Sequence, residues 1–208
     1  IIMEINRIDD YAKGLAFLGK LLHREERAKQ LVDYGEKALK EAATVTGAIP
    51  RQKAVSVYYA EGTDGLSTEC DASRHAELIN LAGARNVFHC SIKTDYGMER
   101  VSLEKVILYN PDVIFVQERE AYNRIRQEQR WRQIKAVKEG RVFIIPKGPF
   151  NWFDRPPSYM RYLGVKWVLS RLYPALYRID MIKETRAFYR LFLELELNDA
   201  QVREIMAG

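Results

Sequence analysis

The stretch SLEKVILYNPDVIFVQ, residues 102–117, joins a helix signal directly to a strand signal. Ser102 is a residue type that caps helix N-termini, and Pro111 disfavours helical backbone at the residue before it. The apolar run within 112–117 is short and rich in β-branched side chains, which predicts a strand buried on both faces. A helix that leads into such a strand is the repeating unit of open α/β sheets.

The same alternation of helix and strand signals continues on both sides of this stretch. Besides 112–117, strands are expected at 54–60, 86–88 and 141–146. Helices are expected at 73–83, 102–110, 158–173, 181–195 and 198–206, and the charged segment 119–138 is expected to be helical in pieces. This order predicts an α/β fold, namely an open three-layer αβα lobe with a mostly parallel sheet.

The residues before this alternation are expected to be helical. Apolar side chains recur at helical spacing in 4–22, and 23–46 combines strong helix formers with opposite charges three or four residues apart. The second of these helices has few apolar positions, so we expect it to be partly solvated and to bridge between bodies. The chain therefore divides into a helical segment, 1–49, and an α/β lobe, 50–208.

The composition is that of an ordinary globular chain, with 208 residues, 47% hydrophobic and 29% charged. The formal net charge is +5, but Lys and Arg are spread along the whole length. Nucleic-acid binders usually concentrate their positive charge in one patch, so we do not expect nucleic acid as a partner. A basic cleft for an anionic ligand is at least as natural.

No motif of enzyme catalysis, cofactor binding or metal binding is visible. The segment GLAFLGKL, 14–21, matches most of a phosphate-binding loop, but Leu21 stands where Ser or Thr is required. His75 and His89 have no visible nucleophile or proton-transfer partner, so we expect them to be structural or surface residues. We therefore expect no catalytic residue, no metal ligand and no cofactor.

The two cysteines, Cys70 and Cys90, form neither a CxxC pair nor a zinc-binding spacing with the histidines. The simplest interpretation is two unrelated thiols. A disulfide between them is the alternative if the protein works outside the cytoplasm.

Residues 97–116, GMERVSLEKVILYNPDVIFV, resemble a recurrent segment of the substrate-binding proteins of ABC importers for iron-siderophore, haem, cobalamin and related metal complexes. Similar segments follow in the family's order at 18–31, 75–88, 148–158, 163–180 and 188–206. The resemblance covers nearly the whole chain. In this family two α/β lobes are joined by a long rigid helix, and ligand is held between them.

The resemblance implies the linking helix and the C-terminal lobe, with the N-terminal lobe absent; the start at Ile1 without a signal peptide fits this expectation. It also implies a non-enzymatic protein, periplasmic or anchored at the cell surface, that delivers a metal complex to an ABC importer permease. Contact with the membrane is expected only through the permease or a lipid anchor. Alternatives are binding of a molybdate- or tungstate-type oxyanion, or an open α/β enzyme or cofactor-scaffold lobe.

Ligand contacts are expected on the proline-rich loop 147–157, which leaves the strand at 141–146. Phe150 and Trp152 would offer flat apolar faces to an organic complex, and Arg155 a planar fork for an anionic group. Tyr59, near the end of the strand at 54–60, is a further candidate. The alternative interpretation is that Trp152 fills the core and Arg155 pairs with Asp154.

One surface acid is expected to meet the importer. In the family, a glutamate on each lobe docks into arginines of the permease, and the resemblance places the glutamate of this lobe at Glu104. The alternative is that Glu104 only complements the dipole at the N-terminus of its helix.

Overall fold

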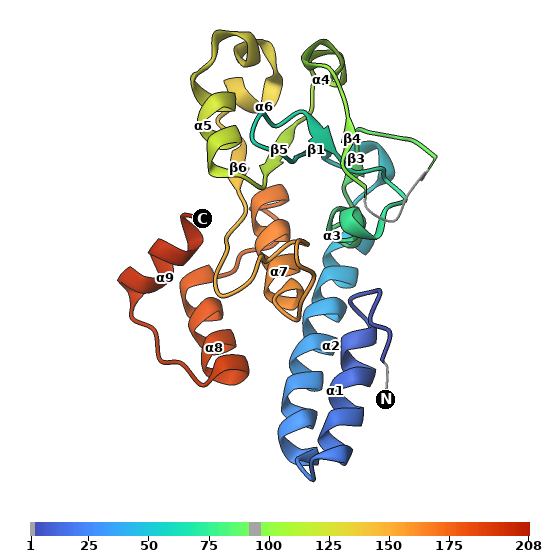
Figure 1. Ribbon diagram of the computed structural model, residues 1–208, viewed down its shortest axis with the longest axis vertical. Coiled ribbons are helices and arrows are strands. Elements are labelled where there is room, and N and C mark those ends of the chain that lie inside the picture. Colours follow the sequence, from blue (N-terminus) through green and yellow to red (C-terminus); the bar gives the residue numbers. More distant parts are fainter. Residues whose placement is uncertain (1–2, 92–96) are drawn as a thin grey trace.

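The computed structural model describes residues 3–91 and 97–208 and contains a four-stranded sheet with helices packed around it (Figure 1). The strands are β1 (Ser56–Ala60), β3 (Arg85–Asn86), β5 (Val113–Val116) and β6 (Val142–Ile144), in the order β3-β1-β5-β6. All three pairings in this sheet are parallel. A separate antiparallel pair is formed by β2 (Ser67–Thr68) and β4 (Glu99–Arg100). The predicted mostly parallel sheet is confirmed.

The α-helices of the described chain lie at both ends of the sequence and between the strands. Their bounds are α1 (Asp10–Leu21), α2 (Glu25–Gly47), α3 (Glu77–Leu81), α4 (Leu103–Tyr109), α5 (Arg119–Gln127), α6 (Lys135–Lys138), α7 (Arg161–Leu172), α8 (Met181–Leu193) and α9 (Asp199–Met206). Short 3-10 turns occur at η1 (Arg51–Lys53), η2 (Arg74–Ala76) and η3 (Gln129–Gln133). None of the described helices combines the length and apolarity needed to cross a membrane.

The two faces of the sheet are buried in separate cores because side chains of a strand alternate between faces. From β1, Val57 and Tyr59 enter a core shared with α2, α3, α7 and α8, whereas Tyr58 and Ala60 enter a core shared with α4, α5 and α6. Every residue of β1 and β5 is buried, as expected for strands covered on both sides. The three-layer αβα arrangement is therefore confirmed.

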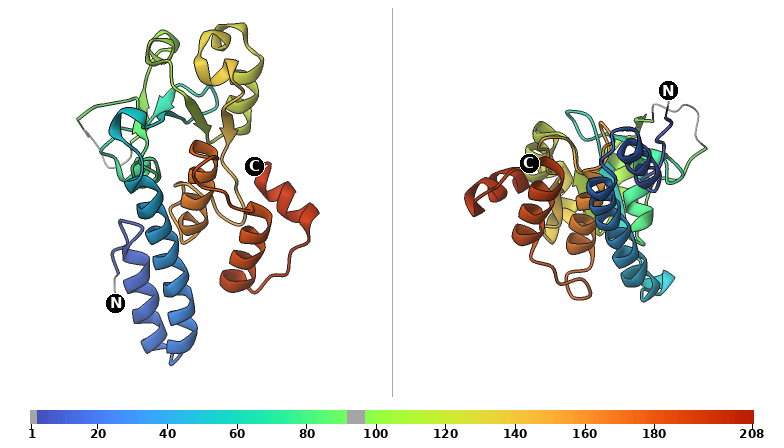
Figure 2. Two further views of the ribbon diagram at one scale, coloured as in Figure 1. Left: turned by 180° about the vertical axis from the view of Figure 1, so that it is seen from behind. Right: turned by 90° about the horizontal axis from the view of Figure 1, so that it is seen from below.

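The helix α2 is a long rod that extends from the sheet and is paired along its outer half with α1 (Figure 2). Its C-terminal half packs on α7 and places Ala38 and Ala42 in the first core. Gly35 permits this contact, because a Cβ there would lie 2.4 Å from the ring of Tyr162. The segment 1–49 is therefore fastened to the lobe by side-chain packing over the described part, 3–49.

Two local expectations need correction, and one pair of strands was not expected. The first helix begins at Asp10 rather than near residue 4, because the Asp10 carboxylate accepts the amides of Asn6 and Arg7 at 3.3 and 3.0 Å. The pair β2–β4 was not predicted, because strands of two residues are too short to show an alternating pattern in the sequence. Cys70 and Cys90 are joined in a disulfide, so the interpretation as unrelated thiols is wrong.

A buried cation fastens α2, α7 and α8 to one another. Lys166, which is 3% exposed, lies on α7 with its Nζ 3.0 Å from Glu41 Oε2 on α2 and 2.9 Å from Glu184 Oε1 on α8. Two tyrosine hydroxyls donate to the same carboxylates, Tyr34 to Glu184 and Tyr177 to Glu41. The ammonium group therefore holds two carboxylates from two other helices.

We predict that Lys166→Met lowers the free energy of unfolding by about 3 kcal/mol, because it leaves two carboxylates without their shared cation. Urea denaturation followed by circular dichroism measures the loss. Lys29→Met is the matched control, because Lys29 pairs with Asp33 on the exposed side of α2 and should hardly matter. An equal effect of the two substitutions would contradict the role of Lys166.

Candidate functional site

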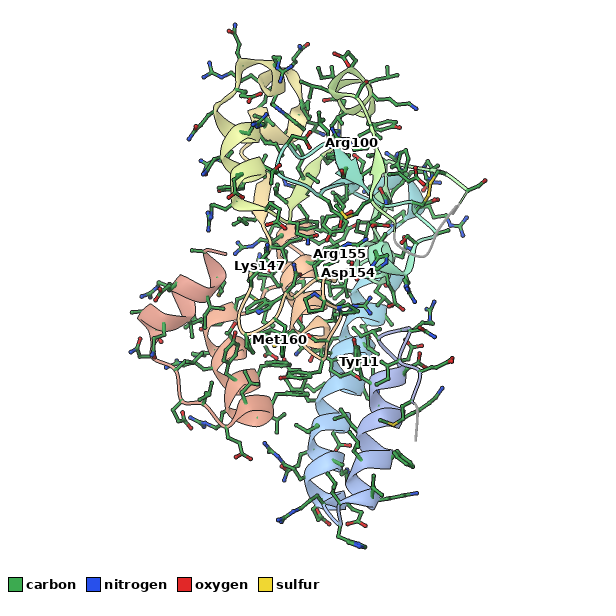
Figure 3. All side chains as sticks on the ribbon, viewed as in Figure 1. Tyr11, Arg100, Lys147, Asp154, Arg155 and Met160 are labelled. Carbon is green, nitrogen blue, oxygen red and sulfur yellow. A yellow bond between two sulfur atoms is a disulfide. The ribbon has the colours of Figure 1, made fainter. Side chains whose placement is uncertain are left out.

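The carboxyl ends of the parallel strands meet in one region, where three polar segments converge. Glu61 follows β1 directly, Gln117 follows β5, and the loop 147–157 follows β6. Figure 3 shows Asp154 and Arg155 of this loop between the sheet and α7, near the centre of the molecule. Open α/β sheets bind their ligands at this edge, so these segments form the candidate site.

Arg155 is the cation at the centre of the site. Its Nε lies 2.9 Å from Glu61 Oε1 and 3.6 Å from Asp154 Oδ2, and its Nη2 lies 2.5 Å from Glu69 Oε1. The three carboxylate side chains are at most 2% exposed, whereas that of Arg155 is 24% exposed. The planar guanidinium thus ties the β6 loop to the segments after β1 and β2, and part of it reaches the surface.

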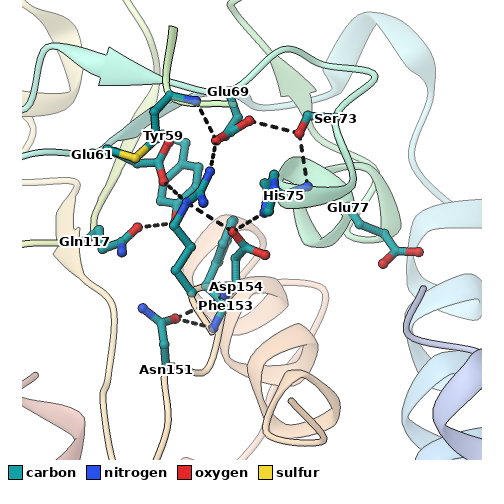
Figure 4. Close-up of polar contacts among 12 residues, drawn as sticks. Tyr59, Glu61, Glu69, Ser73, His75, Glu77, Gln117, Asn151, Phe153 and Asp154 are labelled. Carbon is teal, nitrogen blue, oxygen red and sulfur yellow. Dashed lines mark hydrogen bonds and ion pairs between the residues drawn. The ribbon is translucent and has the colours of Figure 1, made fainter. Parts of the chain in front are cut away.

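A second layer of partners holds these carboxylates (Figure 4). Glu69 accepts the amide of Met98 and the hydroxyl of Ser73, both at 2.9 Å, and Asp154 Oδ2 lies 2.7 Å from His75 Nδ1. Gly97 has a φ of +63° and passes so close that a Cβ there would lie 2.1 Å from the Glu69 carboxylate. The Cys70–Cys90 disulfide adjoins Glu69 and fixes the same segment.

Glu61 is the acid of the cluster with the most perturbed ionisation. Burial, and then the charge of Glu69, raise the pKa of Glu61 to about 8, even though Arg155 acts in the opposite direction. Its second oxygen, Oε2, is buried and has no hydrogen-bond partner within the described chain. A protonated Glu61 at neutral pH reduces the negative charge that Arg155 must balance.

Two of the expected ligand contacts are buried. Trp152 is 0% exposed and lies in the core, where its indole nitrogen donates to the carbonyl of Gly148 at 3.2 Å. The cause is local: Asn151 Oδ1 accepts the amides of Phe153 and Asp154 at 2.7 and 3.1 Å, and this side-chain turn accompanies the inward placement of the loop. The structure therefore agrees with the interpretation in which Trp152 fills the core.

Tyr59, expected as a further ligand contact, is likewise 0% exposed, so its ring does not reach the surface near the end of β1. Its ring packs on Phe153, with centroids 4.7 Å apart, and its hydroxyl donates to Gln117 Oε1 at 2.7 Å. The reason is that both faces of β1 are covered, so neither face of the strand offers a side chain to solvent. Tyr59 therefore links β1 to Gln117 at the end of β5.

Phe150 and Arg155 are the expected ligand contacts that the structure leaves accessible. Phe150 is 44% exposed, and its ring lies edge-to-face with that of Tyr159, at 6.4 Å between centroids. Arg155 pairs with Asp154, as in the alternative interpretation, and with two further acids. Sequence reasoning missed Glu61, Glu69 and the role of His75; the position of Glu61 directly after a predicted strand was the one available signal.

His75 and His89 both have acidic partners. His75 is buried against Asp154, and His89 lies on the surface with its Nδ1 2.7 Å from Asp71 Oδ2. Across the described ranges 3–91 and 97–208, no three His, Cys, Asp or Glu side chains are arranged to hold a metal ion. At the strand-end edge, the guanidinium of Arg155 occupies the space between the acids.

Glu104 lies exposed in the first turn of α4, away from the buried face that carries Leu103 and Val106. A hydrogen bond from its own backbone amide, and then one from Ser102, lower the pKa of its carboxyl group. The side chain is thus held ionised at a helix N-terminus and faces outward.

The α/β fold with its parallel sheet is that of the solute-binding proteins of ABC transporters. The model of the periplasmic binding protein family matches residues 2–149. An ABC transporter solute-binding protein from Sulfurospirillum deleyianum superposes with a TM-score of 0.94 at 40% identity, over 98% of this chain and 63% of that one.

Two further relatives bind metal-containing solutes according to their names. The molybdate-binding protein MolA of Haemophilus influenzae is 29% identical over 187 residues, 88% of this chain and 52% of MolA. The Fe(3+)-citrate-binding protein YfmC of Bacillus subtilis is 21% identical over 149 residues, 70% of this chain and 45% of YfmC. The chain thus spans about half the length of each. It belongs to the periplasmic binding protein family, whose members bind substrates for ABC transporters and are not enzymes.

We predict that Glu61 makes the protein less stable as the pH rises from about 4.5 to about 8. Its folded-state pKa lies above its unfolded value, so the stability it contributes is complete below the unfolded pKa and is lost as pH rises through the folded one. Denaturation midpoints measured across this range should fall in the wild type and fall less in Glu61→Gln, which keeps an oxygen for Arg155.

Glu204→Gln is the control for this pH profile, because Glu204 is an exposed acid on α9. Its profile should follow that of the wild type. Parallel profiles for the wild type and Glu61→Gln would show that Glu61 does not retain its proton in the folded state.

Proposed function

We propose that this protein is an extracytoplasmic substrate-binding protein that captures a metal complex, such as an iron-siderophore, haem or cobalamin complex, and delivers it to the permease of an ABC importer. The observation that carries the proposal is the loop after β6, which holds both the exposed Phe150 and the partly exposed Arg155. An accessible aromatic ring and a fixed guanidinium on one loop suit an organic ligand that carries anionic oxygens.

A molybdate- or tungstate-type oxyanion is the second candidate, and the similarity to MolA favours it. The charges at the site favour the organic complex instead. Arg155 is already matched by three buried acids, so a small oxyanion would have to compete with Glu61 and Glu69 for its donors. The ring of Phe150 is exposed, so an organic ligand can contact it without displacing an ion pair.

We further propose that residues 1–49 hold the linking helix and 50–208 the C-terminal lobe of a two-lobed binding protein. The long rod of α2 supports this assignment, because it leaves the sheet and carries α1 beyond it (Figure 1). Exposed apolar side chains gather where the two helices meet and suit contact with another body: Phe17, Leu18, Leu21 and Leu22.

The ligand is identified by titrating the full-length gene product with ferric citrate, a ferric siderophore, haem, cobalamin, molybdate and tungstate, using calorimetry. We predict saturable binding of one of the organic complexes. Phe150→Ala should then weaken it by about 1 kcal/mol, or roughly fivefold, because an aromatic contact is lost while the fold is unaffected.

The control is Leu176→Ala, which removes an exposed apolar side chain from the α7–α8 connection. It should leave the affinity unchanged. Binding of molybdate or tungstate alone, with the same affinity in Phe150→Ala, would replace the metal complex by the oxyanion. Failure of all six solutes to bind would contradict the proposal that the substrate is a metal-containing solute of these kinds.

We propose that Glu104 docks into basic residues of the permease. Glu104→Arg should reduce uptake and importer-stimulated ATP hydrolysis strongly, because like charges would face each other, and Glu104→Gln should reduce them less. Both variants should bind ligand as the wild type does. Glu120→Arg, which reverses an acid in the first turn of α5, is the matched control. Wild-type transport by Glu104→Arg would leave only the dipole role.

A further inference from the structure

A second pocket lies on the opposite side of β6 from β5, away from the strand-end cluster. β6 is an edge strand of the sheet, and α5, α7 and the end of α9 surround its free side (Figure 1). The pocket is open to solvent and has a volume of about 330 Å³. Its walls carry three arginines and three aromatic rings: Arg119, Arg126, Arg171, Tyr122, Phe143 and Trp167.

In this pocket, which we call the arginine pocket, Arg126 and Arg171 form no ion pair within the described chain. Arg126 donates to the hydroxyl of Tyr122 at 2.8 Å, and Arg119 donates to the main-chain oxygens of Ala207 and Gly208. These bonds use only some of the five N–H donors that each guanidinium carries. The pocket therefore keeps its positive charge and has donors to spare.

Arg171 gives the clearest evidence for unused hydrogen-bond donors in the arginine pocket. Its Nε is buried and makes no hydrogen bond within the described chain. Its guanidinium carbon lies 5.4 Å from the centre of the Phe143 ring and 5.8 Å from that of Trp167. Stacking against two rings orients the planar group, but it supplies neither an acceptor nor a negative charge.

By contrast, three other buried or partly buried cations of the described chain are paired with acids. Arg161 is paired with Glu77 at 2.6 Å, Lys166 is held by Glu41 and Glu184, and Arg155 by three acids. Gathering three guanidinium groups in one pocket, where Arg126 and Arg171 have no acidic partner, is costly because their like charges repel at short range. An anion bound between them would remove this repulsion and accept the unused donors.

We propose that the arginine pocket is a second binding site, specific for a phosphate-type anion. Arg119 and Arg126 line it from α5 and Arg171 lines it from α7, so donors from two helices are available to one tetrahedral group. The volume admits such a group together with a small attached moiety. The site is separate from the strand-end edge and does not rest on the function proposed for that edge.

The test uses the full-length gene product. Inorganic phosphate and pyrophosphate are titrated by calorimetry, and sedimentation with phosphatidylglycerol or phosphatidylcholine vesicles tests whether the phosphate belongs to a lipid headgroup. We expect saturable binding of free phosphate compounds or of the anionic vesicles. Arg126→Gln, at an exposed position, and Arg171→Met should each weaken that binding about tenfold, because a charged hydrogen bond is lost.

Arg132→Gln is the matched control, because Arg132 is an exposed arginine on η3 outside the arginine pocket. It should bind as the wild type does. The proposal is overturned if neither form of phosphate binds saturably, if Arg132→Gln weakens binding as much as Arg126→Gln, or if Arg126→Gln binds normally. Arg126→Gln keeps the test decisive even if Arg171→Met does not fold, and circular dichroism checks the fold of each variant.

Discussion

The ion cluster around Arg155 is the interaction on which the candidate site depends. Three acidic side chains from three segments are almost completely buried beside one cation, which balances the negative charge that they carry. Contact with these three acids fixes the position of Arg155, and therefore also the path of the loop that follows β6. The same course places Trp152 in the core and leaves Phe150 at the surface. The shape of the strand-end edge is therefore a consequence of where these charges can be balanced.

Ion pairs between a cation and acidic side chains also hold the helices against one another. Arg161 on α7 pairs with Glu77 on α3, and Lys166 on α7 joins carboxylates of α2 and α8. In each case a cation on α7 reaches acids that lie far away in the sequence. These contacts make α7 the hub between the sheet and the α2 rod. Arg171, also on α7, is the exception, since it forms no ion pair within the described chain.

The sequence predicted the layers well, because apolar runs and helix caps are local signals. The strand at 112–117 and the Ser102 cap of the preceding helix both appear in the structure, the latter with its side chain accepting the amide of Lys105. The site was predicted less well. Trp152 and Tyr59 look like ligand contacts in sequence, but their exposure depends on packing across the sheet. Glu69 pairs with Arg155 across 86 positions, and no local pattern reports such a contact.

The central claim is that solute binds at the carboxyl ends of β1, β5 and β6, against the loop 147–157. The most direct measurement is a crystal structure of the full-length gene product with its bound solute. The account predicts ligand density in contact with Phe150 and the exposed part of Arg155, above an intact cluster of Glu61, Glu69 and Asp154. Ligand density that touches neither side chain would contradict it.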